Sequence, residues 1–285
     1  MPRFAEIQGR YVYLTIDGLE YRVYFEEAGS GIPILCQHTA GADGRQWRHL
    51  LEDPQITANF RVIAHDLPYH GKSLPPAGVE WWKHEYQLTQ AFFMKFMVGL
   101  ARELELDCPV YMGCSMGGHL AGDLALNHPQ EFRAVIGVEA ALASKGTDTF
   151  IRWFHHPRLS NASKPSLMYT LMAPESPEAS KQETIWTYSQ GAPPVFLGDL
   201  NYYSREHDLT ETAQSIDTHK IGVYLLGGEY DWSAAPADVK ALADRVKGSH
   251  YTEMKGVGHF PMSENPAVFK RALMPVLESI RQSSR

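Results

Sequence analysis

Hydrophobic and polar residues follow two different patterns along this chain. Between residues 11 and 29 they alternate on either side of Asp17-Gly18, which predicts a β-hairpin with a two-residue turn. Elsewhere the hydrophobic residues come in short unbroken runs, which are typical of strands that are covered on both faces. These runs are 32–36, 60–64, 110–112, 134–138 and 221–226.

Between the runs lie segments whose hydrophobic residues recur every three to four positions, as on one face of a helix. The clearest is 85–106, where Phe92, Phe96, Leu100 and Leu104 have this spacing. Further helices are expected around Leu50 and at 118–127, 236–246 and 266–280, with a short strand at 251–254. Strands that alternate with helices predict an α/β fold with a mostly parallel central sheet flanked by helices.

Residues 142–218 break this alternation. Several prolines, among them Pro165, Pro174 and Pro177, keep any helix in this segment short, and its many aromatic residues are not typical of a disordered linker. We therefore expect a helical cap inserted into an α/β core that is formed by residues 1–141 and 219–285.

Composition narrows the classes of partner. The formal charge is −7 and no run of like charges occurs, so we expect neither nucleic acid nor a membrane surface as a partner. The three cysteines form no metal-binding pattern, and the first residues do not resemble a signal peptide. These features favour a cytoplasmic protein that acts on a small molecule.

The candidate chemistry starts at Gly113-Cys114-Ser115-Met116-Gly117, where a predicted strand runs into a predicted helix. Gly-x-Ser-x-Gly in this setting is the pattern of a nucleophile elbow, a strained turn that exposes the serine hydroxyl. The start of the helix favours negative charge beside the serine. Cys114 is expected to be a buried residue that points away from Ser115.

On these residues the chain resembles the α/β-hydrolase superfamily, and the resemblance extends over nearly all of the chain outside the cap. It implies an α/β-hydrolase fold with a serine, an acid and a histidine in that order. The implied base is His259, in the loop before the last helix. The implied acid is Asp231, at the end of a strand, and the alternative is Glu139, because some relatives take their acid from that strand.

The resemblance also implies an oxyanion hole made by the backbone amides of Met116 and Ala40. Thr39 stands where most relatives have glycine, so the local backbone is expected to differ from theirs. His38 is expected to be structural, as are Asp66 and His70 in a segment that resembles a structural turn of the family.

A serine at the elbow excludes reactions that need an aspartate there, namely haloalkane dehalogenation and epoxide opening through an alkyl-enzyme ester. Acyl transfer remains, and the aromatic cap favours a largely apolar or aromatic ester or lactone. No metal or cofactor is implied, because serine and histidine supply nucleophile and base. Two alternatives stay open. One is a carbon–carbon bond hydrolase of aromatic-ring degradation, which the resemblance implies because such enzymes share Ser-Met-Gly-Gly; Arg152 and Arg158 in the cap could then hold a substrate carboxylate. The other is a small-molecule receptor.

Overall fold

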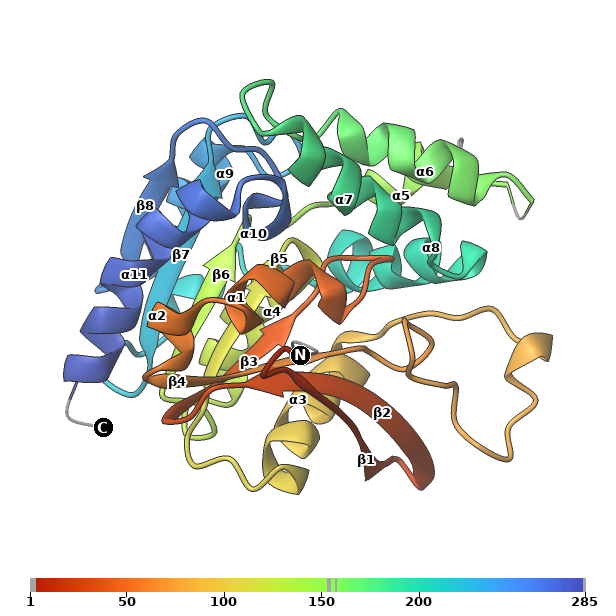
Figure 1. The fold of residues 1–285 in the computed structure, drawn as a ribbon, viewed down its shortest axis with the longest axis horizontal. Coiled ribbons are helices and arrows are strands. Elements are labelled where there is room, and N and C mark those ends of the chain that lie inside the picture. The colour runs from red at the N-terminus through yellow and green to blue at the C-terminus, as the bar shows by residue number, and fades with distance from the viewer. Residues whose placement is uncertain (1–3, 153–154, 157, 284–285) are drawn as a thin grey trace.

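The computed structural model describes residues 4–152, 155–156 and 158–283, and within them eight strands form one sheet in the order β1-β2-β4-β3-β5-β6-β7-β8 (Figure 1). The strands are β1 (Gln8–Ile16), β2 (Leu19–Ala28), β3 (Ile32–Gln37), β4 (Phe60–His65), β5 (Val110–Cys114), β6 (Ala134–Val138), β7 (Gly222–Gly228) and β8 (His250–Met254). The β1–β2 hairpin joins the sheet through antiparallel pairing of β2 with β4. From β4 to β8 every pairing is parallel, so the predicted fold class is confirmed.

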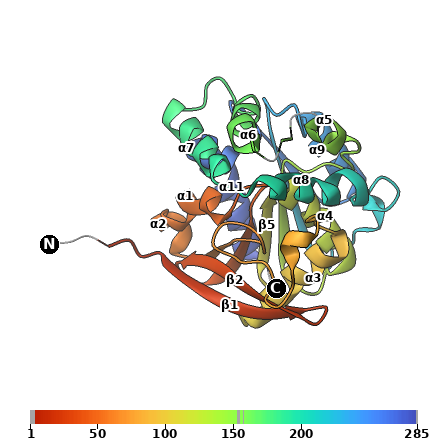
Figure 2. The ribbon, with the colours of Figure 1, turned by 90° about the vertical axis from the view of Figure 1, so that its right-hand side faces the viewer.

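Helices cover both faces of the sheet (Figures 1 and 2). On one face lie α3 (Gln90–Glu103), α4 (Met116–Asn127) and α9 (Pro236–Arg245), and on the other lie α1 (Arg48–Leu51), α2 (Pro54–Thr57) and α11 (Pro266–Gln282). Successive strand residues alternate between the two cores, as Leu35 and Tyr111 do on one side and Cys36 and Met112 on the other. Because both faces are buried, the strands appear in the sequence as unbroken hydrophobic runs.

Two helices begin at other residues than the periodicity predicted. α3 starts at Gln90 rather than residue 85, because the Thr89 side chain caps the amide of Phe92 at 3.2 Å. The residues just before it contact the segment 142–218 instead, since Leu88 N donates to Gly198 O at 3.0 Å. α4 starts at Met116 rather than residue 118, so the helix begins immediately after Ser115.

The segment 142–218 between β6 and β7, called the cap below, lies above the carboxyl ends of the parallel strands (Figure 1). Its helices have between 6 and 12 residues. They are α5 (Thr147–Arg152), α6 (Ser160–Tyr169), α7 (Glu178–Ser189) and α8 (Pro193–Asn201), followed by a π-helical turn (Tyr202–Glu206). A short helix of the core, α10 (Pro261–Glu264), lies against α7 and precedes α11. The cap helices therefore meet the loops that follow the strands at one edge of the sheet.

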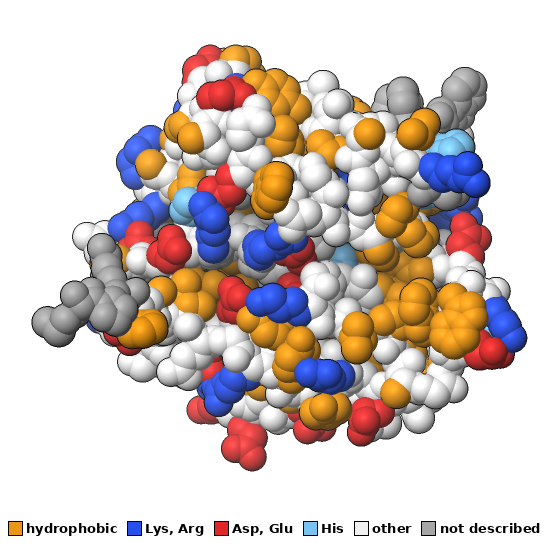
Figure 3. Space-filling model, turned by 45° about the vertical axis from the view of Figure 1, so that its right-hand side comes forward, with side chains coloured by type: hydrophobic (Ala, Val, Ile, Leu, Met, Phe, Trp, Pro, Cys, Tyr) orange, Lys and Arg blue, Asp and Glu red, His pale blue; other side chains and the backbone are white. Residues whose placement is uncertain are grey.

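The surface beside the cap is partly apolar. The loop between β4 and α3 exposes Leu74, Trp81 and Trp82, and hydrophobic side chains gather on the side of the molecule where this loop lies (Figure 3). None of the helices in the described part of the chain is long and apolar enough to cross a membrane.

Candidate active site

Ser115 occupies the sharp turn between β5 and α4, with φ 56° and ψ −114°. A positive φ at a non-glycine residue costs about 1–3 kcal/mol, so the surrounding structure must hold it in place. The amide of Ser115 donates to Val138 O at 2.9 Å. A Cβ atom at Gly113 would lie 2.4 Å from Gly117 O, which explains why the turn needs glycine there.

The carbonyl of Ser115 is held by His119, a residue that the sequence did not single out. His119 Nδ1 lies 2.8 Å from Ser115 O and Nε2 lies 2.9 Å from Ser144 Oγ. Burial, together with the nearby ring of His207, lowers the pKa of His119 to about 3. The ring is therefore neutral, donates from Nδ1 and steadies the strained turn. Its spacing of four residues from Ser115 in a helix was the available signal.

His259 lies in the loop after β8 and is paired with Asp231. Its Nδ1 atom is 2.6 Å from Asp231 Oδ2, and the other carboxylate oxygen accepts from the amides of Ser233 at 2.7 Å and Ala234 at 3.2 Å. Burial alone would raise the pKa of Asp231, but His259 and the two amides outweigh it and hold this pKa below its usual range. Asp231 is thus an ionised carboxylate that orients the imidazole.

Glu139, the alternative acid, makes no hydrogen bond to His259 among the described residues. It is fully buried, with φ 52°, and its Oε2 atom accepts from the amide of Gly228 at 2.9 Å. Burial and the negative charge of Asp231 raise the pKa of Glu139 well above its usual range. The two carboxyl groups therefore differ in charge: Asp231 is ionised and Glu139 is a neutral acid.

Ser115 and His259 line a small cavity of about 50 Å³, called the Ser115 cavity below. Ala40 lines it from the core, while Leu167 and Phe196 belong to its wall on the cap side. No hydrogen bond between Ser115 Oγ and His259 Nε2 is present among the described residues. Such contacts are often long until substrate binds.

Ala40 lies in the loop after β3, on the wall of the Ser115 cavity. The backbone amides of the two residues next to Ala40 are already hydrogen-bonded. Thr39 N donates to Gln46 Oε1 at 3.0 Å, and Gly41 N donates to Asp199 Oδ2 at 2.7 Å. Within the described residues the amide of Ala40 has no hydrogen-bond partner. Met116 supplies the first amide of α4, directly after Ser115. The amides of Ala40 and Met116 are thus candidate donors to an anion at Ser115.

Residues 34–272 match the model of a family described as "Alpha/beta hydrolase family". The chain belongs to this alpha/beta hydrolase family. It is 34% identical over 304 residues to bifunctional epoxide hydrolase 2 of Sus scrofa, an alignment that covers 90% of this chain and 53% of that protein. The chain therefore spans about half the length of this curated relative.

Two solved structures are similar to this alpha/beta hydrolase over nearly its whole length. A thermophilic esterase from Thermogutta terrifontis has a TM-score of 0.80 at 22% identity, over 96% of this chain and 99% of that one. An enol-lactonase from Burkholderia xenovorans LB400 has a TM-score of 0.77 at 18% identity, over 93% and 99% of the two chains. At these identities the likeness establishes the α/β-hydrolase fold.

Two buried histidines of this alpha/beta hydrolase, His38 and His70, connect the loops near the Ser115 cavity by hydrogen bonds. His38 is buried, with Nδ1 2.8 Å from Thr39 O and Nε2 accepting from Leu67 N at 3.1 Å. Burial, with the ring of His70 nearby, lowers the pKa of His38 to about 4, so this ring is neutral. His70 Nε2 lies 2.8 Å from Asp199 Oδ2 and joins the core to α8. Asp66 accepts from two loop amides, those of Gly44 and Lys72.

The thiol beside the serine in this alpha/beta hydrolase is buried in the core. Cys114 Sγ lies 3.2 Å from His259 O, behind the turn, and the side chain is fully inaccessible. Burial raises the pKa of Cys114 well above its usual range, and the negative charge of Asp231 adds to this shift. A thiolate nucleophile is therefore disfavoured at this position.

Glu264, which the sequence did not single out, connects the loop of His259 to the cap. One carboxylate oxygen accepts from Gly258 N at 2.8 Å and Phe260 N at 3.0 Å, the two neighbours of His259. The other accepts from Ala173 N at 2.8 Å and Ser176 Oγ at 2.9 Å in the cap. Such a carboxylate is not visible as a site residue in the sequence, because its partners are mainly backbone amides.

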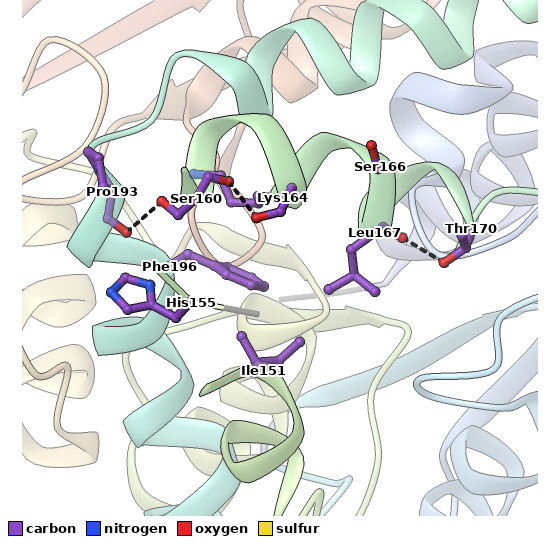
Figure 4. Close-up of a pocket in the computed structure, with 10 residues that line it drawn as sticks. Ile151, His155, Ser160, Lys164, Ser166, Leu167, Thr170, Pro193 and Phe196 are labelled. Atoms are coloured by element: carbon purple, nitrogen blue, oxygen red, sulfur yellow. Dashed lines mark hydrogen bonds between the residues drawn. The ribbon is translucent and has the colours of Figure 1, made fainter. Parts of the chain in front are cut away.

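A second, larger pocket of about 340 Å³ lies beside the Ser115 cavity, between α5, α6 and α8 (Figure 4). Ile151, Leu167 and Phe196 line both spaces. In the described part of the chain no cluster of histidine, cysteine and acidic residues could hold a metal ion.

Proposed function

We propose that the chain is a serine hydrolase that cleaves a carboxylic ester or lactone through an acyl-enzyme. Ser115 is the nucleophile, His259 the general base and Asp231 the acid that orients it, while the amides of Ala40 and Met116 bind the oxyanion. The observation that carries the proposal is that Ser115, on its strained turn, lines one cavity with an imidazole bonded to an ionised aspartate. The esterase and the enol-lactonase that share the fold support it.

The reaction follows from this arrangement. Ser115 Oγ attacks the carbonyl carbon while His259 Nε2 takes its proton, and Asp231 stabilises the imidazolium that forms. The carbonyl oxygen becomes an oxyanion between the two amides. Collapse of this intermediate breaks the bond to the alkoxy oxygen, which receives the proton from His259. Water then attacks the acyl-enzyme by the same steps, which restores Ser115 and releases the acid.

Epoxide opening, the activity in the name of the Sus scrofa relative, does not fit Ser115. Opening an epoxide through a covalent intermediate needs a carboxylate, since water can then hydrolyse the resulting ester. A serine would instead form an ether, which water does not cleave under these conditions. Acyl transfer is the reaction for which a serine–histidine pair is suited.

In the alternative of carbon–carbon bond hydrolysis, Arg152 and Arg158 were candidates to hold a substrate carboxylate. Arg152 pairs instead with Asp148, and Arg158 is exposed. Neither residue lines the Ser115 cavity. These two arginines therefore lend that alternative no support, whereas the apolar cap side chains around the cavity favour an apolar acyl group.

The test is hydrolysis of p-nitrophenyl esters of increasing acyl length by the wild type, Ser115→Ala and Ser283→Ala. Ser283→Ala is the matched control, because it makes the same substitution at a serine that follows the last helix and is remote from the cavity. We expect turnover in the wild type and the control and a loss of roughly 10⁶-fold in Ser115→Ala, the size seen when a serine nucleophile is removed. Turnover that survives in Ser115→Ala would refute the proposal. A single covalent modification without turnover would identify a receptor.

A further inference from the structure

The peptide group between Ser115 and Met116 joins two parts of the candidate site. Its carbonyl oxygen belongs to Ser115, and its N–H is the Met116 amide at the start of α4. A trans peptide group is planar, so its C=O and N–H point in opposite directions and turn together. The first amides of a helix have no carbonyl partner within it, which leaves the Met116 N–H for a bound ligand. Contacts that hold Ser115 O therefore also set the direction of the Met116 N–H.

His119 holds this carbonyl with two donors. Its backbone amide donates to Ser115 O at 2.8 Å, as in any α-helix, and its Nδ1 atom also lies 2.8 Å from Ser115 O. A carbonyl oxygen only accepts, so Nδ1 carries the proton, and the lowered pKa of His119 keeps the ring neutral with Nε2 as an acceptor. The hydroxyl of Ser144, in the cap, then donates to Nε2 at 2.9 Å. This bond fixes the tautomer that the Ser115 carbonyl requires.

The ring of His119 is also held by its surroundings. The residue is 2% exposed, and the centroids of the His207 and Tyr203 rings lie 4.8 and 5.4 Å from that of its own ring. His207 is fixed in turn, with Nδ1 3.0 Å from Asp123 Oδ2 and Nε2 3.0 Å from Ala141 O. His119 is therefore a donor of fixed position, which needs no reorganisation when charge develops nearby.

The peptide group needs such support because of the conformation of Ser115. Its φ of 56° and ψ of −114° lie outside the regions that non-glycine residues normally occupy. Rotation about ψ turns the plane of the Ser115–Met116 peptide group, and a strained torsion persists only where neighbouring contacts hold it. Loss of the ring bond would let this plane turn and carry the Met116 N–H with it. A carbonyl that accepts two hydrogen bonds is also more polarised, which makes the N–H of its peptide group a stronger donor.

We propose that His119 is a positioning residue that holds the Met116 amide in the direction of the oxyanion, through the peptide group between Ser115 and Met116. This inference rests on the proposed function and adds a residue that contacts neither the substrate nor the Ser115 hydroxyl. Because the oxyanion forms only after attack, the contribution of His119 belongs to the transition state and not to substrate binding. Ser144 contributes by keeping the proton of His119 on Nδ1.

Two substitutions of His119 separate this role from packing. The side-chain nitrogen of His119→Asn takes the place of Nδ1 as a donor to Ser115 O, whereas His119→Leu fills a similar volume without a donor. We expect kcat for a p-nitrophenyl ester to fall roughly 10- to 100-fold in His119→Leu, with KM little changed. His119→Asn should keep kcat within about fivefold. His84→Leu makes the same substitution at an exposed histidine and is the control.

Inhibition by an alkyl trifluoromethyl ketone measures the oxyanion directly. Ser115 Oγ forms a bond to the carbonyl carbon, its proton passes to His259, and the carbonyl oxygen becomes an oxyanion in an adduct without a leaving group. We expect His119→Leu to weaken this inhibitor by about the factor by which it lowers kcat/KM, as for a transition-state analogue. Ser144→Ala keeps the histidine and should weaken the inhibitor roughly 3- to 10-fold.

Unchanged kcat and inhibitor affinity in His119→Leu, in a protein whose wild type cleaves the ester, would overturn this inference alone. Equal losses in His119→Asn and His119→Leu would also overturn it, because they would indicate packing. If His119→Leu does not fold, unchanged inhibitor affinity in Ser144→Ala overturns it instead. A wild type that neither cleaves esters nor forms the adduct would refute the proposed function, and the inference with it.

Discussion

The backbone amide of His259 donates a hydrogen bond of 2.9 Å to the carbonyl of Leu171. His259 belongs to the core and Leu171 to the cap, so the loop that carries the imidazole is attached directly to the cap. Glu264 reinforces this attachment with four hydrogen bonds, two to the loop and two to the cap. The position of the proposed base therefore depends on cap contacts as well as on Asp231.

Glu264→Gln should lower both stability and turnover. A glutamine amide nitrogen cannot accept a hydrogen bond, so two of the four donors would lose their partner. We expect the free energy of unfolding to fall by about 1–3 kcal/mol and kcat by roughly 10- to 100-fold with a smaller change in KM. Denaturant unfolding and ester kinetics measure the two effects. Glu278→Gln, in an exposed ion pair on α11, is the control. A stability loss with kcat unchanged would show that Glu264 does not position His259.

Asp231→Asn and Glu139→Gln should have very different effects on turnover. Replacing the ionised Asp231 removes the acceptor for His259 Nδ1, and we expect kcat to fall about 10⁴-fold. Because Glu139 is already neutral, an amide of the same shape should keep kcat within about tenfold. Ester kinetics with both variants measure this difference. The opposite result, with turnover lost in Glu139→Gln and kept in Asp231→Asn, would move the role of acid to Glu139.

The His70–Asp199 pair should make stability depend on pH. Both ring nitrogens of His70 contact oxygen acceptors, Pro68 O at 2.9 Å and Asp199 Oδ2 at 2.8 Å. Burial alone would lower the pKa of His70, but the charge and hydrogen bond of Asp199 outweigh it and raise this pKa above its usual range. A raised pKa stabilises the folded state fully below the unfolded value of about 6.5, and the contribution is lost as pH rises through the folded value.

We therefore expect His70→Gln to lower the free energy of unfolding more at about pH 6 than at about pH 9. Denaturant unfolding at both values measures this difference. His84→Gln, at an exposed histidine outside the pair, serves as the control. A loss of stability that is equal at both values would mean that folding leaves the pKa of His70 unshifted.

Alkylation of the native protein should select one of the three cysteines. Cys36 and Cys114 are fully buried, and burial raises the pKa of both thiols, whereas Cys108 is partly exposed. We expect iodoacetamide to label Cys108 first and the other two only after denaturation, as mass spectrometry of the peptides would show. Rapid native labelling of Cys114 would indicate that the turn behind Ser115 opens in solution.

The fold could be predicted from the sequence because hydrophobic runs and helical spacing are local signals. The run 134–138 coincides with β6, and the hairpin turns at Asp17-Gly18, where both residues have positive φ. The start of α3 was predicted wrongly, because contact with α8 holds the preceding residues out of the helix. Tertiary contact overrode periodicity there.

The Gly-x-Ser-x-Gly motif was enough to predict that Ser115 lies on a turn between a strand and a helix. Other features of the candidate site depend on distances between segments that are remote in the sequence. Asp231 and Glu139 both lie just beyond the ends of strands, and only the structure shows which carboxylate meets the imidazole. Ser144 reads as an ordinary cap serine until its contact with His119 is known. Such features arise when the chain folds back on itself, and no local pattern records them.

Asp199 on α8 accepts the amide of Gly41, next to Ala40, while Leu171 in the cap accepts the amide of His259. The cap is thus part of the framework around the serine as well as a cover over it. An engineer who exchanged this segment for that of another family member would replace the substrate-facing surface and remove these supports together. A functional chimera would need to retain Asp199 and the 171–176 stretch, so new specificity is more readily built by changing side chains within the existing helices.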